Sequence, residues 1–141
     1  MKKLLLRTSW LFGSCAVLIA VSALAVSSLF GSMCENDVLK ELVSPDGKKK
    51  VVVFQRNCGA TTGFSTQASV LSVSGSLPNE GGNVFSADAN HGRSPSGPGG
   101  GPELEASWVG PKLLLLEHHG EARVFKAEPI IGDTHVRFVS R

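Results

Sequence analysis

The chain has 141 residues and a formal net charge of +2, a length that suits one domain rather than several. From residue 34 onward, 12 acidic residues accompany 11 lysines and arginines, so the positive balance belongs to the N-terminal part. A nearly neutral remainder without a clustered basic face argues against a nucleic-acid partner.

Residues 8–34 form the first element, an uncharged and largely apolar run. Its 27 residues exceed the roughly 20 that an α-helix needs to cross the hydrocarbon core of a bilayer. Three positive charges precede it, and such charges stay on the cytoplasmic side. The sequence therefore predicts a signal or transmembrane anchor over residues 1–33, and an extracytoplasmic domain over residues 34–141 of a bacterial-type cell.

Three fates of this N-terminal segment remain open. An uncleaved single-pass anchor in the cytoplasmic membrane is favoured, because the run is longer than the roughly 7 to 15 apolar residues of a signal peptide. Cleavage after residues 23–25, a small-x-small sequence, would instead release the domain into the periplasm. Lipidation at Cys34 is the third alternative, although the bulky Met33 precedes that cysteine. All three place the domain outside the cytoplasm.

The domain begins with a predicted hairpin. Two β-prone runs, 38–43 and 49–55, flank the sequence Ser-Pro-Asp-Gly-Lys at 44–48. Proline presets φ, aspartate bonds to its own backbone and glycine supplies the left-handed position, so this sequence predicts a turn. We expect a three-residue loop with a bulge at Gly47.

The hairpin register predicts a disulfide. If Ser44 faces Lys48, the residue numbers of cross-strand partners add up to 92, and so do those of Cys34 and Cys58. The oxidising compartment outside the cytoplasm permits the bond. It would close a loop of about 25 residues and stabilise the fold by about 3 kcal/mol. Cys15 lies within the apolar run and is interpreted as an apolar filler.

The remaining chain predicts further strands and no helix. Residues 104–108 alternate apolar and polar side chains, and four consecutive leucines in 113–117 predict a strand that is buried on both faces. Other strands are expected at 65–74, 83–87, 122–127 and 134–139, with a long glycine- and proline-rich loop at 90–102. The expected fold is all-β, a small antiparallel sandwich or open barrel of about seven strands.

Sequence motifs in this part resemble those of a family of small bacterial exported or membrane-anchored proteins with no assigned activity. The motifs are SPDGK (44–48), CGATTGFSTQ (58–67), NVF (83–85), AD (87–88), NHG (90–92), GPGGGPE (97–103) and ARVF (122–125). The resemblance covers most of residues 44–126. It implies export and β-structure, and it assigns no catalytic residue.

The cysteines and histidines suggest two kinds of chemistry. Cys58 in a glycine-rich corner has the setting of a nucleophile, but a disulfide is the favoured interpretation outside the cytoplasm. Asp88, His91 and one of the adjacent pair His118 and His119 make the best metal set, although adjacent strand residues point to opposite faces. The chain has no Cys-x-x-Cys and no spaced histidine pair, so we expect no metal and no cofactor.

The candidate binding surface joins the corner after Cys58 to the 90–102 loop, because long loops in compact domains often bind partners. Its residues are Thr61, Thr62, Ser65, Thr66, Asn90, His91 and Arg93. The leading hypothesis is a membrane-tethered extracytoplasmic binding or accessory module, with a protein of the cell envelope as partner. The competing hypothesis is a small cell-envelope hydrolase or thiol enzyme that uses Cys58 or Ser65 with His91.

Overall fold

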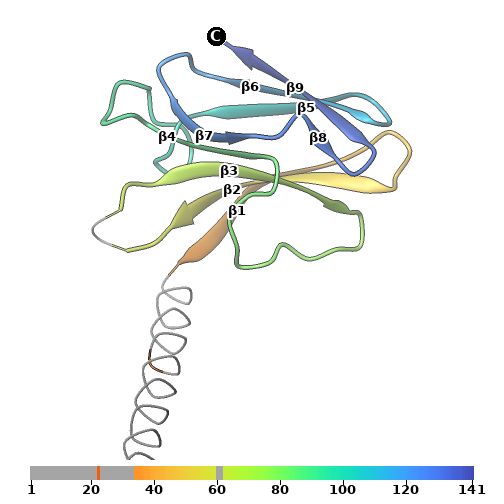
Figure 1. Ribbon diagram of the computed structural model, residues 1–141, viewed down its shortest axis with the longest axis horizontal. Helices are drawn as coiled ribbons and strands as arrows, with labels where there is room; N and C mark the ends of the chain where they lie inside the picture. The colour runs from red at the N-terminus through yellow and green to blue at the C-terminus, as the bar shows by residue number, and fades with distance from the viewer. Residues whose placement is uncertain (1–21, 23–33, 60–61) are drawn as a thin grey trace, which may run out of the picture. The chain divides into compact units, whose positions relative to one another are not determined.

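The computed structural model describes Ser22 and residues 34–59 and 62–141 (Figure 1). The predicted anchor falls on residues 1–33 and, apart from Ser22, lies outside the described residues. Among the described residues, no helix is both long and apolar enough to span a bilayer. Residues 34–141 form a compact unit of their own.

This unit is built from strands arranged in two sheets (Figure 1). The strands in its described residues are β1 (Glu35–Val43), β2 (Lys49–Asn57), β3 (Ser65–Ser72), β4 (Phe85–Asp88), β5 (Leu104–Gly110), β6 (Leu113–His118), β7 (Arg123–Ala127), β8 (Ile130–Ile131) and β9 (Thr134–Ser140). The five-stranded sheet has the order β1-β2-β3-β4-β7, and the four-stranded sheet has the order β5-β6-β9-β8. The prediction of an all-β fold is confirmed.

One hydrophobic core joins the two sheets. Alternate side chains of a strand point to the same face, so the apolar residues of each strand meet those of the other sheet. The buried cluster comprises Val51, Val53, Ala68, Val70, Val84, Phe85 and Ala87 on one side and Leu104, Ala106, Leu114, Leu116 and Val136 on the other. Burial of these side chains from water is the main force that holds the sheets together.

The strand count and directions differ from the prediction. Nine strands are present in the described residues instead of about seven, and β8 was missed because two residues are too short for a visible alternation. The pair β6 and β9 is parallel, whereas an antiparallel fold was predicted. After β6 the chain joins the other sheet as β7 and returns through β8, so it enters β9 in the direction of β6.

The four leucines of β6 confirm the predicted strand, but burial on both faces is wrong. Leu114 and Leu116 are fully buried in the core. Leu113 and Leu115, which point the other way, are partly exposed. One face of the four-stranded sheet therefore lies against the core, and the other remains accessible.

The first hairpin pairs the two cysteines as predicted, but its loop length and the position of its bulge differ from the prediction. Ser44 N donates to Lys49 O (2.9 Å), so the loop is one residue longer than predicted, and partner numbers near the turn add up to 93. The register shifts at Leu39 instead of at Gly47, and beyond this bulge the sum is 92. Gly47 takes the expected left-handed conformation with φ 70°. Cys34 and Cys58 form the predicted disulfide.

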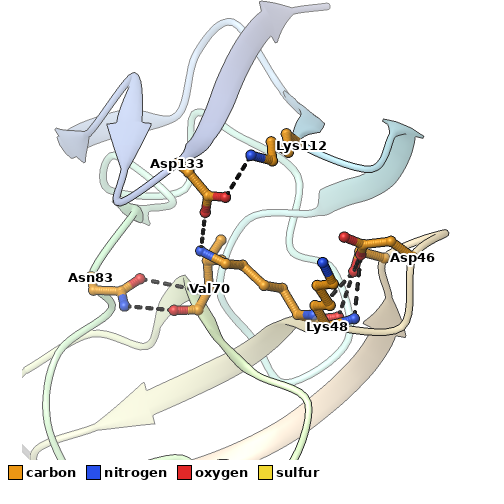
Figure 2. Close-up of polar contacts among 8 residues, drawn as sticks. Asp46, Lys48, Val70, Asn83, Lys112 and Asp133 are labelled. Carbon is orange, nitrogen blue, oxygen red and sulfur yellow. Dashed lines mark hydrogen bonds and ion pairs between the residues drawn. The ribbon is translucent and has the colours of Figure 1, made fainter.

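Side chains extend the strand pairing and tie the sheets at one end (Figure 2). The Asn83 amide continues the β3–β4 ladder, because its oxygen accepts from Val70 N and its nitrogen donates to Val70 O, both at 2.9 Å. Asp133, in the β8–β9 turn, pairs with Lys49 at the start of β2 and with Lys112 at 3.0 Å. These two ammonium groups lower the pKa of the Asp133 carboxyl far below its ordinary value.

The Asp133 contacts predict a loss of stability in acid. The folded-state pKa lies below the unfolded value of 3.8, so the contribution is complete above that pH and is lost as the pH falls toward the folded pKa. Asp133→Asn is expected to lower Tm at neutral pH and to flatten the acid limb of a plot of Tm against pH. Asp37→Asn is the control, because Asp37 is exposed and has no ion pair among the described residues. Parallel acid limbs for wild type and Asp133→Asn would contradict this prediction.

Candidate functional site

An open cleft of about 850 Å³ lies on the five-stranded sheet, on the face turned away from the core. Phe85 and Ala87 of β4 point into the core, so Ser86 and Asp88 between and after them point into the cleft. Residues of the β2–β3 corner and of the segment after β4 form its rim. The lining residues used below are Arg56, Thr62, Phe64, Ser65, Gln67, Ser86, Asp88, His91, Ser96, Arg123 and Phe125.

The cleft floor contains a row of polar residues across four strands. Arg56 is opposite Ser65, and Ser65 is opposite Asp88. Asp88 is in turn opposite Arg123. Directly opposed residues of an antiparallel pair point to the same face, so this row places two cations, a carboxylate and a hydroxyl on one face of the sheet.

Asp88 and Arg123 form a bidentate ion pair. Arg123 Nε donates to Asp88 Oδ1 (3.1 Å), and Nη2 donates to Oδ2. The guanidinium holds the pKa of the Asp88 carboxyl below its ordinary value, with help from the backbone N–H of Asn90, and Asp88 raises the pKa of Arg123. Asp88 is thus a fixed anion at neutral pH, which does not suit a general acid.

Arg56 connects the cleft with the start of the domain. Its Nη1 donates to Asn36 Oδ1 (2.7 Å) and to Asn79 Oδ1 (3.2 Å). Asn79 Nδ2 donates to the carbonyl oxygen of Cys34 (2.8 Å). Both partners of Arg56 are neutral amides, and among residues 34–59 and 62–141 no carboxylate forms an ion pair with it.

The rim carries a strained segment after β4. Asn90 and His91 have φ values of 48° and 57°, and Gly92 follows at 83°. Left-handed non-glycine residues cost on the order of 1–3 kcal/mol each and persist where their surroundings hold them. Asn90 N donates to Asp88 Oδ1 (2.9 Å), and Asn90 Nδ2 donates to Glu121 O (3.1 Å). These bonds hold the exposed His91 at the edge of the cleft.

Two exposed phenylalanines stand at the same cleft. Phe64 is 45% exposed and Phe125 is 61% exposed, which is high for rings of this size. The Arg123 guanidinium lies 5.1 Å from the centre of the Phe125 ring, a cation–π contact. Gly100 leaves room for the Phe64 ring, because a Cβ at this glycine would lie 2.7 Å from it.

The glycine- and proline-rich stretch is an ordered turn. Gly97 N donates to Gly101 O (2.7 Å), and Ser96 and Pro102 form an isolated bridge. The Thr66 hydroxyl, 1% exposed, donates to Pro102 O (2.6 Å). The stretch therefore packs onto β3 and contributes to the cleft only through part of its length.

The structure brings together three of the seven candidate surface residues. Thr62, Ser65 and His91 line the cleft. Thr66 is buried, Asn90 supports the rim, and Arg93 pairs with the carboxylate of Glu121 at 2.6 Å, so these three do not line it. Thr61 lies outside the described residues.

The residues that dominate the cleft were not predicted from the sequence. Arg56, Phe64, Arg123 and Phe125 were not singled out, and Asp88 was considered only as a metal ligand. Arg56 and Arg123 are far apart in the sequence and meet through the pairing of four strands. No local pattern encodes that row, although the two aromatic residues stand out as large apolar side chains next to polar ones.

In the described residues, the cysteine, serine and histidine candidates do not form a pair of nucleophile and base. Cys58 is in the disulfide and offers no free thiol. The Ser65 hydroxyl donates to Arg56 O (3.4 Å) and accepts from Gln67 Nε2 (2.9 Å). Within residues 34–59 and 62–141, no histidine bonds to Ser65, and no group of three acidic, histidine or cysteine side chains is placed to hold a metal. No family model, curated protein or solved structure matches the chain.

Proposed function

We propose that the domain is a binding module of the cell envelope, tethered to the cytoplasmic membrane by residues 1–33, and that the cleft is its ligand site. The observation that carries the proposal is the polar row from Arg56 to Arg123 with two exposed phenylalanine rings beside it. Ligand sites combine apolar contact area with a few placed polar groups, and the cleft volume is within the usual range for such sites.

The contacts favour binding over the competing enzymatic hypothesis. A hydrolase or thiol enzyme needs a nucleophile within hydrogen-bond reach of a base. Cys58 is bonded to Cys34, and the Ser65 hydroxyl is bonded to a backbone carbonyl and an amide. The carboxylate of Asp88 is occupied by Arg123. A non-catalytic role accounts for all three arrangements.

Photocrosslinking in living cells that naturally produce the protein tests this function. A photoreactive residue at position 125, in the cleft, is expected to give one discrete adduct with an envelope component. The control is the same residue at position 109, because Val109 is 57% exposed but belongs to the four-stranded sheet and does not line the cleft. The proposal fails if neither position gives an adduct, or if both give the same adducts in equal yield.

A further inference from the structure

We infer that the cleft takes a carboxylate-bearing saccharide, with the Arg56 guanidinium against the carboxylate and the rings of Phe64 and Phe125 against sugar faces. This inference rests on the proposed function and names the ligand class for the same cleft. Three features of the cleft support it: the uncompensated charge of Arg56, the position of the cleft on a sheet face, and the presence of hydroxyl groups beside aromatic rings.

The first feature is the positive charge of Arg56. Arg123 is neutralised by Asp88, whereas Arg56 meets only the amide oxygens of Asn36 and Asn79. Both of those bonds leave from Nη1, so the edge formed by Nε and Nη2 has no partner among the described residues. That edge carries two parallel N–H groups, the geometry that a carboxylate accepts in a bidentate pair. The cleft therefore has a place for one anionic group of a ligand.

The second feature is the position of the cleft on the five-stranded sheet. Three of the four floor strands, β2, β3 and β4, have a hydrogen-bonded neighbour on both sides, and the fourth, β7, is an edge strand. Over β2, β3 and β4 the backbone groups are used within the sheet, so a ligand meets only side chains there. An extended peptide is usually recognised through the unpaired backbone of an edge strand. Such an edge is present only at β7, on one side of the cleft, and most of the floor lies on interior strands, which favours a ligand that binds through its own substituents.

The third feature is the combination of hydroxyl groups and aromatic rings that line the cleft. Hydroxyl groups of Thr62, Ser65, Ser86 and Ser96 line the cleft, together with the exposed rings. A pyranose has hydroxyls around its rim and C–H bonds on its faces. Hydroxyl side chains donate to and accept from the former, and the negative face of an aromatic ring attracts the latter. A sugar acid combines both features with the carboxylate that Arg56 requires.

Calorimetric titration of the full chain in non-ionic detergent tests the ligand class. The probes are a trisaccharide of hexuronic acid, the neutral hexose trisaccharide with the same linkage, and triglutamate. We expect the uronate to bind at least ~10-fold more tightly than either other probe, because only it supplies the carboxylate and the sugar faces together. Its affinity is expected to fall as salt is added, since the guanidinium–carboxylate attraction is screened.

Single-residue variants test which side chains contact the uronate. Arg56→Gln is expected to weaken uronate binding ~10-fold, and Phe125→Ala is expected to weaken it ~3-fold. Arg137→Gln, on the four-stranded sheet, is the matched charge control and leaves the affinity unchanged. Because Arg56 also supports Asn79, Asn79→Ala tests the structural contribution. It removes that support, keeps the guanidinium, and is expected to bind the uronate like wild type.

Four outcomes overturn the inference. Equal binding of the neutral trisaccharide would remove the role of the carboxylate, and tighter binding of triglutamate would indicate an acidic peptide. Equal losses of uronate affinity in Arg56→Gln and Asn79→Ala would mean that Arg56 acts only by supporting Asn79. Absence of uronate binding also overturns it. If position 125 still gives its cellular adduct in that case, the proposed function stands and only the ligand class is wrong.

Discussion

Replacing Cys34 and Cys58 together with alanine is expected to lower the free energy of unfolding by about 3 kcal/mol. The disulfide joins residues 24 apart, and a loop of this size removes that much chain entropy from the unfolded state. In a domain of about a hundred residues, this loss corresponds to a fall in Tm of roughly 15 °C. β1 is also an edge strand whose side chains are mostly exposed, so little core packing holds it once the disulfide is removed.

Thermal unfolding of the full chain with and without reductant measures this effect. Oxidised wild type is expected to show the high Tm, and reduced wild type should match the double variant. Reductant added to the double variant is the control and should change nothing, although Cys15 is still present. Equal Tm values for oxidised and reduced wild type would show that β1 is held without the disulfide.

The disulfide also shows how local patterns predict pairing. The turn sequence at 44–48 placed the hairpin, but the loop is one residue longer than expected and the bulge lies at Leu39. The longer loop raises the sum of partner numbers to 93, and the bulge restores it to 92 before the cysteines. The predicted Cys34–Cys58 bond is therefore right, although both details of the register were wrong.

Strands with strong alternation or β-prone runs were predicted from the sequence, whereas their pairing beyond the first hairpin was not. The parallel pair β6 and β9 joins strands separated by β7 and β8, and no turn between neighbours specifies it. For the same reason the cleft was predicted mainly at its rim, where glycine-rich corners mark Thr62 and His91, and Ser65 is the single floor residue that was predicted. Its floor depends on the cross-strand row of Arg56, Ser65, Asp88 and Arg123, which exists only once four strands have paired.

The second large effect is expected at Phe85, because this ring joins the two sheets. It is fully buried on β4, and its centre lies 5.4 Å from the ring of His118 and 6.0 Å from that of Phe138. Both partners belong to the four-stranded sheet. Phe85→Ala is expected to lower the free energy of unfolding by about 3–5 kcal/mol, since it removes apolar contacts and leaves a cavity. Urea denaturation of the oxidised chain measures the loss.

Phe125→Ala is the matched control for the same change of residue. Phe125 is 61% exposed and has a cation–π contact with Arg123, so replacing it with alanine should lower the free energy of unfolding of the domain by less than about 1 kcal/mol. The two phenylalanines thus separate stability from binding: Phe85→Ala is expected to weaken the fold, whereas Phe125→Ala is expected to weaken the proposed uronate binding in a folded domain. Equal losses of stability at the two positions would mean that Phe125 packs against the domain, and its exposure would no longer support a binding cleft.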